Sequence, residues 1–196
     1  WNTLLPIDQY TESDVDDSPY EMKFKGEEKP VFPHNLPAFK GTSLDLVRRT
    51  PFGNTMTKDI AKEAITAEHM GEDAITDFLC VSFSATDYVG HQFGTNAIEL
   101  EDTYIRLDKD LEDLFAFLDA KCGKDNYLVF LTADHAAIQN PQSLIDVKLN
   151  AGFINARVIN DTVMPTSLSS DLSSENRKTR LSFQVRNLKA TACLSA

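Results

Sequence analysis

The chain has 196 residues, which is enough for one domain of ordinary size with a hydrophobic core. Its 19 Lys and Arg stand against 30 Asp and Glu, a formal net charge of −11 at pH 7. This balance argues against binding to nucleic acid or to an anionic membrane surface, because both need a basic face. The 42% hydrophobic content argues against general disorder. No apolar run approaches the ~20 residues of a membrane span, so we expect no membrane insertion.

The cysteines do not form a recognisable framework. Cys80, Cys122 and Cys193 are too few and too scattered for a set of disulfides. Cys80 falls within a predicted strand, where we expect it to be a small buried apolar residue. The sequence neither shows nor excludes a signal peptide.

The first 50 residues predict loops. Five prolines interrupt every short apolar run there, namely Pro6, Pro19, Pro30, Pro33 and Pro37. Turn residues at positions 50–54 precede a predicted helix that begins near Thr57 and stops at Gly71. Its apolar positions have helical spacing and are Ile60, Ala61, Ala64 and Ile65.

The middle of the chain predicts a strand, a long helix and a second strand. Residues 78–84 and 127–132 are short apolar runs suited to buried strands. We expect Asn96 to cap the helix, with Glu99 completing a capping box, and Gly123 to end it. Its core face consists of Leu100, Tyr104, Leu107, Leu111, Leu114 and Leu118. A strand–helix–strand crossover gives parallel strands, so we predict an α/β fold with a mostly parallel sheet flanked by helices.

The composition changes near residue 165. A serine-rich stretch follows, with Ser167, Ser169, Ser170, Ser173 and Ser174. The last part is basic and has no acid; its bases are Arg177, Lys178, Arg180, Arg186 and Lys189. We therefore expect two regions, an α/β part over residues 1–165 and a poorly ordered tail over residues 166–196.

Two pairs of side chains follow the two predicted strands. Asp87 and His91 lie in the expected turn after the first strand, and Asp134 and His135 come directly after the second. Ligands bind outside the carboxyl ends of parallel strands, so both pairs would converge on one cleft. Carboxylate oxygen and imidazole nitrogen form a ligand set that suits zinc, with manganese or iron as alternatives.

Structural roles for the same residues remain open. Asp87 could only tighten its turn, and His91 and His135 could be ordinary surface histidines. His34 lies in a proline-flanked loop and His69 at a helix end, so we expect both to be structural.

The two segments that carry these pairs are recognisable. Residues 81–91 (VSFSATDYVGH) and 130–135 (FLTADH) closely resemble the alkaline phosphatase superfamily. The nearest branch is that of the monomeric bacterial alkaline phosphatases related to type I phosphodiesterases and nucleotide pyrophosphatases. The resemblance covers about residues 1–140 and includes residues 51–55 (PFGNT).

This resemblance implies a site with two zinc ions. Asp87 and His91 would hold one zinc, and Asp134 and His135 would hold the other. The reaction would be phosphoryl transfer from a small phosphate ester to an enzyme hydroxyl, followed by hydrolysis. The resemblance also implies a periplasmic or secreted protein.

The sequence departs from that pattern in several places. The nucleophilic Thr or Ser, a further zinc-binding Asp and the phosphate-binding Lys and Arg of such enzymes belong upstream of the segment present. Their remaining zinc-binding His belongs downstream, and no His follows His135. Ala136 stands where Gly is usual. We therefore expect no catalytic nucleophile and about half of each zinc ligand set.

Three interpretations follow. The first is the central part of an alkaline phosphatase-like hydrolase, inactive by itself. The second is a phosphodiesterase or nucleotide pyrophosphatase of the same superfamily. The third is an inactive α/β module that binds metal or a partner. In each case the incomplete sheet would permit self-association through its exposed edges.

Overall fold

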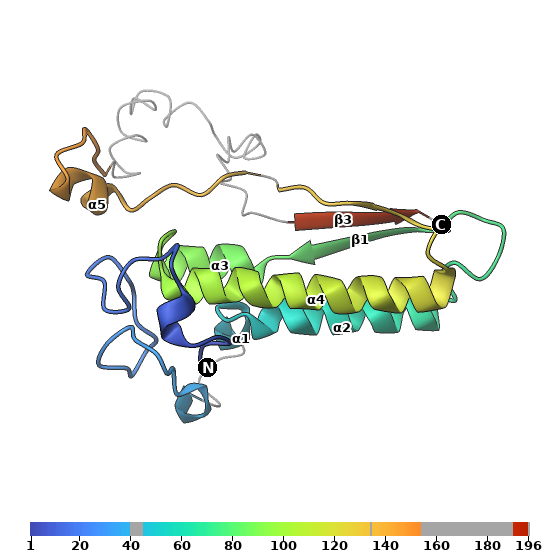
Figure 1. Cartoon of the computed structure of the whole chain (residues 1–196), viewed down its shortest axis with the longest axis horizontal. Helices are drawn as coiled ribbons and strands as arrows, with labels where there is room; N and C mark the ends of the chain where they lie inside the picture. The colour runs from blue at the N-terminus through green and yellow to red at the C-terminus, as the bar shows by residue number, and fades with distance from the viewer. Residues whose placement is uncertain (40–44, 134, 154–189, 196) are drawn as a thin grey trace, which may run out of the picture. The chain divides into compact units, whose positions relative to one another are not determined.

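The structure, a computed structural model, describes residues 1–39, 45–133, 135–153 and 190–195 (Figure 1). They fall into two compact units, one of Trp1–Gln139 with Asn187–Ala196 and the other of Asn140–Arg186. The elements of the first unit are η1 (Ile7–Gln9), η2 (Leu36–Phe39), α1 (Asp45–Arg48), α2 (Phe52–Ala67), β1 (Phe78–Phe83), α3 (Ala85–Phe93), α4 (Ile98–Cys122), β2 (Leu128–Phe130) and β3 (Ala190–Ser195). The described part of the second unit contains α5 (Pro141–Asp146).

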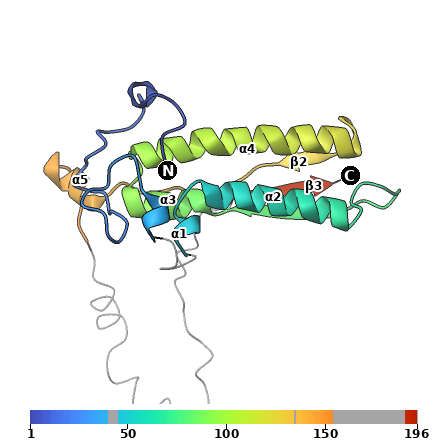
Figure 2. The same cartoon turned by 90° about the horizontal axis from the view of Figure 1, so that it is seen from below.

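The core lies between two long helices and the strands. Helices α2 and α4 lie side by side and cover one face of the strands (Figures 1 and 2). The buried residues at this contact are Ala61, Ile65, Val81, Phe83, Leu107, Leu114 and Leu118. The predicted leucine stripe of the long helix is therefore the core face, except that Tyr104 is 53% exposed.

The strands form a three-stranded sheet in the order β1–β3–β2. Strand β3 pairs antiparallel with β1 and also antiparallel with β2. It follows that β1 and β2 run in the same direction without pairing with each other. The α/β class holds, but the mostly parallel sheet is not confirmed, because a strand from the far end of the chain lies between the two predicted neighbours.

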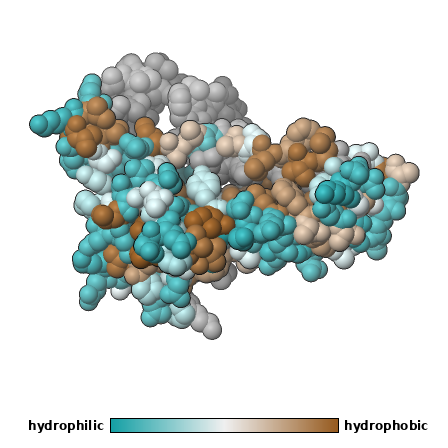
Figure 3. Space-filling model, in the orientation of Figure 1, coloured by the Kyte–Doolittle hydropathy of each residue, from teal (hydrophilic) through white to brown (hydrophobic). Residues whose placement is uncertain are grey.

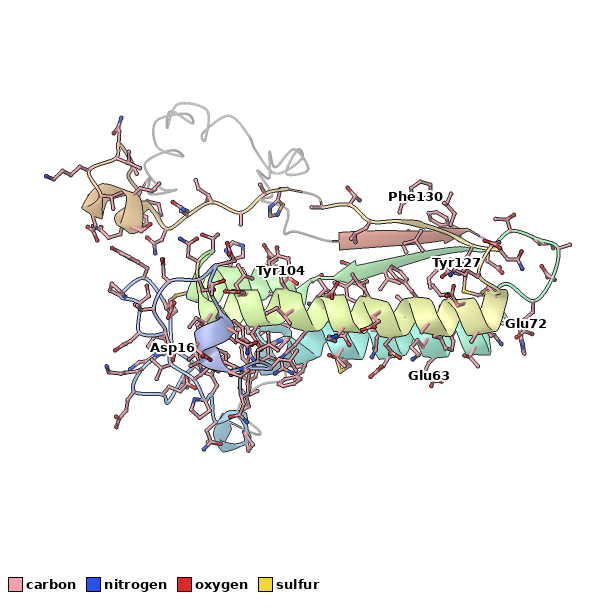
Figure 4. The ribbon with its side chains drawn as sticks, viewed as in Figure 1. Asp16, Glu63, Glu72, Tyr104, Tyr127 and Phe130 are labelled. Carbon is pink, nitrogen blue, oxygen red and sulfur yellow. The ribbon has the colours of Figure 1, made fainter. Side chains whose placement is uncertain are left out.

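One face of the sheet is open in the part of the chain that the structure describes. Along β1 and β2 the more exposed positions alternate with half-buried or buried ones, and Phe78, Leu128 and Phe130 are 67%, 52% and 57% exposed. Figure 4 shows Phe130 pointing away from α4, and Figure 3 shows apolar surface over the same strands. The expectation that Cys80 is buried is wrong, because its side chain lies on this open face.

The amino-terminal loops pack on the start of α4. A second apolar cluster contains Trp1, Phe24, Val89, Phe93, Ala97 and Leu100. Asp102, which is fully buried, accepts hydrogen bonds from Trp1 Nε1 at 2.7 Å and from the Tyr10 hydroxyl at 2.5 Å. Arg106 also donates to this carboxylate. A buried charge with several donors holds loops that have little regular structure of their own.

Two helix starts differ from the predictions. Helix α2 begins at Phe52, directly after Pro51, because proline is tolerated at a helix start. Its Ile60 is 62% exposed and is not part of the core. The N-cap of α4 is Ala97 and not Asn96, and it makes no side-chain cap. Glu99 does not complete a capping box, because it turns inward to His34.

In the second unit, Asn140 caps α5 by accepting a hydrogen bond from the Gln142 amide at 2.9 Å. The expected boundary between residues 165 and 166 lies outside the described residues. None of the helices in the described part is both long and apolar enough to cross a membrane.

Candidate functional site

The first predicted pair lies on a helix and not in a turn. Helix α3 begins at Ala85, two residues after β1 ends. Asp87 is in its first turn and His91 in its last, so they lie four residues apart on one helix face. The distance between Asp87 Oδ1 and His91 Nε2 is 3.4 Å. The expected turn is helical because residues 85–93 pack their apolar side against the amino-terminal loops.

Asp87 has a polar atom that is not satisfied within the described residues. Its exposure is 6%, and its Oδ2 atom is buried without a hydrogen-bond partner among them. The side chain of His91 is 59% exposed. A buried carboxylate oxygen costs free energy unless a donor or a cation meets it. Asp87 and His91 therefore suit a metal ion, and their oxygen and nitrogen donors suit zinc.

Of the second predicted pair, Asp134 and His135, the structure describes only His135. Asp134 lies outside the described residues. The Nδ1 atom of His135 is 3.0 Å from the Ala136 carbonyl oxygen, so in the neutral ring Nδ1 carries the proton and donates. That tautomer places the lone pair on Nε2, as in metal-binding histidines whose other nitrogen donates to a backbone carbonyl. Within the described residues, no three His, Cys, Asp or Glu side chains gather as a metal site.

A cavity is lined by residues that neighbour the two predicted pairs in the sequence. Its volume is about 400 Å³, and its lining is Phe83, Thr86, Tyr104, Leu107, Asp108, Leu111, Leu131, Thr132 and Ala133. Thr86 precedes Asp87, and Ala133 precedes residue 134, so segments next to each pair share one space. Tyr104 rises from α4 toward the segment after β2 (Figure 4). The cavity is mostly apolar and open on one side.

Asn54 contacts the start of α3 and was missed by sequence reasoning. It lies in the first turn of α2 and is 1% exposed. Its Oδ1 accepts a hydrogen bond from the Ala85 amide at 3.1 Å, and its Nδ2 donates to Thr86 Oγ1 at 3.0 Å. Its place in a turn-like run at 50–54 was interpreted as local turn chemistry. The one available signal was an amide side chain inside the recognisable segment 51–55.

The remaining histidines lie elsewhere. His34 is buried, with Nδ1 3.0 Å from Glu27 Oε1 and Nε2 3.0 Å from Glu99 Oε1. Burial alone would lower the pKa of His34, but these two carboxylates outweigh it and raise the pKa. Burial and the neighbouring Glu99 carboxylate raise the pKa of Glu21 to about 8. His69 is exposed and lies beside Glu72. The buried contacts of His34 fit the structural role expected for it, and the role expected for His69 stays a prediction.

The chain is similar to known phosphatases over most of its length. The family model of type I phosphodiesterase / nucleotide pyrophosphatase matches residues 6–185. The alkaline phosphatase PhoV of Synechococcus elongatus is 56% identical over 141 residues, which are 72% of this chain and 26% of that protein. A Myroides odoratus protein named calcium-transporting ATPase is 50% identical over 162 residues, 81% of this chain and 30% of that protein.

A solved structure has the same fold. The crystal structure of wild-type alkaline phosphatase PafA matches with a TM-score of 0.77 and 43% identity, over 90% of this chain and 33% of that one. The chain therefore spans a third or less of the length of these relatives. On the extent of the family match, the chain belongs to the type I phosphodiesterase / nucleotide pyrophosphatase family and is related to the alkaline phosphatases of that superfamily.

Proposed function

We propose that this chain is the central part of a zinc-dependent phosphate monoester hydrolase. The observation that carries the proposal is the carboxylate of Asp87. Its Oδ1 lies 3.4 Å from Nε2 of the exposed His91, and its Oδ2 is buried without a hydrogen-bond partner among the described residues. The printed names of two relatives, an alkaline phosphatase and an ATPase, both describe hydrolysis at phosphorus, and this supports the same reaction class.

The proposed metal ligands form two pairs. Asp87 and His91 would bind one zinc, and Asp134 and His135 the other. Bound zinc would polarise the phosphoryl oxygens and stabilise the leaving oxygen. The hydrogen bond from His135 to the Ala136 carbonyl supports this assignment, because it orients the ring and selects its tautomer. The cavity shared by Thr86 and Ala133 supports convergence of the two pairs.

The chain's own residues supply about half of each proposed ligand set. Catalytic zinc usually has three protein ligands, and each pair provides two. A phosphatase of this kind also needs a nucleophile beside the metal. Thr55 and Thr86 are engaged with Asp110 and Asn54, so neither serves as that nucleophile in our proposal. The 196 residues should therefore bind zinc weakly and hydrolyse phosphate esters at the background rate.

A second candidate is hydrolysis of phosphodiesters or nucleotides. The description of the matching family favours it. The mostly apolar cavity beside Thr86 is compatible with a base or another organic group attached to the phosphate. The third interpretation is a catalytically inactive α/β module that binds metal weakly or serves as an interaction surface.

Two further proposals concern the protein's surroundings. We place the protein in the periplasm or outside the cell, on the resemblance of residues 81–91 and 130–135 to secreted phosphatases. We also propose that the 196-residue chain self-associates through the exposed edges of its sheet, β1 and β2, which also present an open apolar face.

Zinc binding tests the proposed function. Isothermal titration of the chain with zinc at pH 8 should show binding at two sites, and Asp87→Asn or His91→Gln should remove one of them. The exposed Asp73→Asn change should leave both sites intact. At pH 5.5 binding should weaken, because protons compete with zinc for imidazole and carboxylate ligands. Equal zinc affinity in Asp87→Asn and in the unchanged chain would refute the assignment.

Hydrolysis of p-nitrophenyl phosphate provides the second measurement. The chain with added zinc should not exceed the rate of the Asp134→Ala, His135→Ala variant. Zinc-dependent turnover that this variant loses would show that the chain contains a nucleophile after all. Comparison with bis-p-nitrophenyl phosphate in a complete homologue carrying this segment separates the monoester from the diester activity.

A further inference from the structure

Helix α3 begins without a cap of its own. Ser84 stands at the N-cap position with helical angles, φ −87° and ψ −13°, and makes no side-chain cap hydrogen bond. The first amides of a helix have no partner within the helix and need an acceptor from elsewhere. For the Ala85 amide, that acceptor is Asn54 Oδ1, which comes from α2 at a separation of 31 residues.

The Asn54 side chain is fixed at both ends of its amide. The Ala85 amide can only donate, so it must face Oδ1, and Nδ2 must then face Thr86 Oγ1. The residue is 1% exposed, so no water competes readily for these bonds. An aspartate could accept but not donate, and an alanine could do neither. One amide therefore holds two successive residues of α3.

The neighbouring residue explains how the two helices approach so closely. A Cβ atom on Gly53 would lie 3.0 Å from the Ala85 Cβ and 3.0 Å from the Val47 carbonyl oxygen. Real Cβ atoms rarely come that close to other atoms, so a larger residue at this position would force a neighbour to shift where the first turn of α2 contacts the first turn of α3. Gly53 permits the contact, and Asn54 forms hydrogen bonds across it.

We propose that Asn54 is a positioning residue for the metal site. Asp87 directly follows the two residues that Asn54 holds, and its buried Oδ2 depends on how the first turn of α3 is placed. Asn54 acts through the backbone of Ala85 and the hydroxyl of Thr86, and it does not touch the metal. This inference rests on the proposed function, because it assumes that Asp87 binds zinc.

The alternative is a purely structural cap, and zinc affinity separates the two. Residues that orient metal ligands typically change metal affinity by ~10–100-fold when removed. We therefore expect Asn54→Ala to weaken zinc binding by about tenfold or more, measured by competition with a fluorescent chelator at a temperature where circular dichroism shows every variant folded. Thr50→Ala is the matched control, because Thr50 is equally buried and its hydroxyl donates to the Val47 carbonyl oxygen, which belongs to α1 and not to α3.

A second pair of variants keeps the test sharp if Asn54→Ala unfolds. Thr86→Val removes the acceptor for Asn54 Nδ2 and leaves the Ala85 bond in place, so it should weaken zinc binding by several-fold. Thr86→Ser keeps the hydroxyl and should bind as the unchanged chain does. Weaker zinc binding by Thr86→Val than by Thr86→Ser, with unchanged melting temperatures of the metal-free proteins, would support the positioning role of Asn54.

The possible results distinguish failure of the proposed zinc site from failure of the positioning role of Asn54. If the unchanged chain binds no zinc, the proposed function fails and this inference fails with it. If Asp87→Asn removes the zinc site that contains Asp87 while Asn54→Ala and Thr86→Val bind zinc there normally, only the positioning role is overturned. If Thr50→Ala weakens zinc binding as much as Asn54→Ala, the effect is one of stability, and the positioning role is also overturned.

Discussion

The imidazole of His34 and the carboxylate of Glu99 form a hydrogen bond of 3.0 Å although 65 residues separate them in the chain. Both side chains have 0% exposure. The second oxygen of Glu99 is buried without a hydrogen-bond partner among the described residues. This contact fastens the loop around His34 to the first turn of α4. Because His34 and Glu99 are both titratable and both buried, the free energy of unfolding should depend on pH.

The free energy of unfolding should fall as the pH rises above about 4.5. The pKa of Glu21 is about 8 in the folded chain and about 4.3 in an unfolded one. Between these values only the folded state holds this proton, so raising the pH destabilises it. Burial also raises the pKa of Glu99, and carboxylates raise that of His34, so both act in the same direction. The groups facing Glu21 are the carboxylates of Glu99, Asp16 and Asp14.

Glu21→Gln should remove part of this dependence. The variant and the unchanged chain should have similar urea midpoints near pH 5, and the variant should be more stable at pH 9 by on the order of 1 kcal/mol. Glu63→Gln is the control, because Glu63 points from α2 into solvent (Figure 4). Parallel pH profiles for all three proteins would contradict the prediction.

Replacing His34 with phenylalanine should destabilise the fold by about 3 kcal/mol at pH 7. The ring would still fit among Trp1, Phe24, Phe32 and Phe93, which surround His34. Glu99, however, would lose its partner while remaining buried. Thermal melts in the metal-free state measure the loss, and the double variant His34→Phe, Glu99→Leu should recover part of it. No recovery in the double variant would mean that the loss arises from packing and not from the unpaired carboxyl group.

Gly53→Ala should destabilise the chain by about 1–3 kcal/mol, although alanine favours a helix more than glycine does. The added Cβ would meet the Ala85 Cβ and the Val47 carbonyl oxygen at 3.0 Å. Gly90→Ala is the matched change within α3, where the nearest atom to a Cβ is a Leu100 methyl at 3.7 Å. We expect that variant to be neutral or stabilised by up to ~1 kcal/mol. Chemical denaturation measures the free energy of unfolding of both variants. A gain in stability for Gly53→Ala as well as for Gly90→Ala would contradict the close approach of Gly53 to Ala85.

Phe130→Thr should reduce self-association of the 196-residue chain. Phe130 is 57% exposed on the open face of the sheet, and threonine retains a high preference for strands. Light scattering after size-exclusion chromatography should show a smaller average mass for the variant at the same concentration. Ile60→Thr is the control, because Ile60 is 62% exposed on α2 and away from the strands. A monomeric unchanged chain would refute association through this face.

Local patterns in the sequence predicted the long helix and the positions of the two strands, although the second strand is shorter than predicted, at Leu128–Phe130, and is not buried on both faces. Leu107, Leu114 and Leu118 recur at helical spacing, and the structure buries all three in α4. Gly123 ends that helix with φ +90°, a conformation that glycine adopts without strain. The pairing of the strands was not predictable, because β3 comes from a tail without a clear period.

The sequence predicted only the part of the candidate site that lies in contiguous segments. The recognisable runs at 81–91 and 130–135 identify Asp87, His91, Asp134 and His135 as candidates, since each run is contiguous. Neither run contains Asn54. Its role could not be read from the sequence, because its two hydrogen bonds join residues that lie 31 and 32 positions apart in the chain. Sequence spacing also does not show that Asp87 lies on a helix with one oxygen buried.

The sequence alone determined the apolar stripe of α4, the end of that helix and the residue types of the candidate site. These properties depend on neighbours within one or two turns, so they can be read from short segments. The tertiary structure alone decided that Asn54 caps α3, that His34 pairs with Glu99 and that Cys80 lies on the open face. Such contacts join distant segments, and their free energy exists only after the hydrophobic core has brought those segments together.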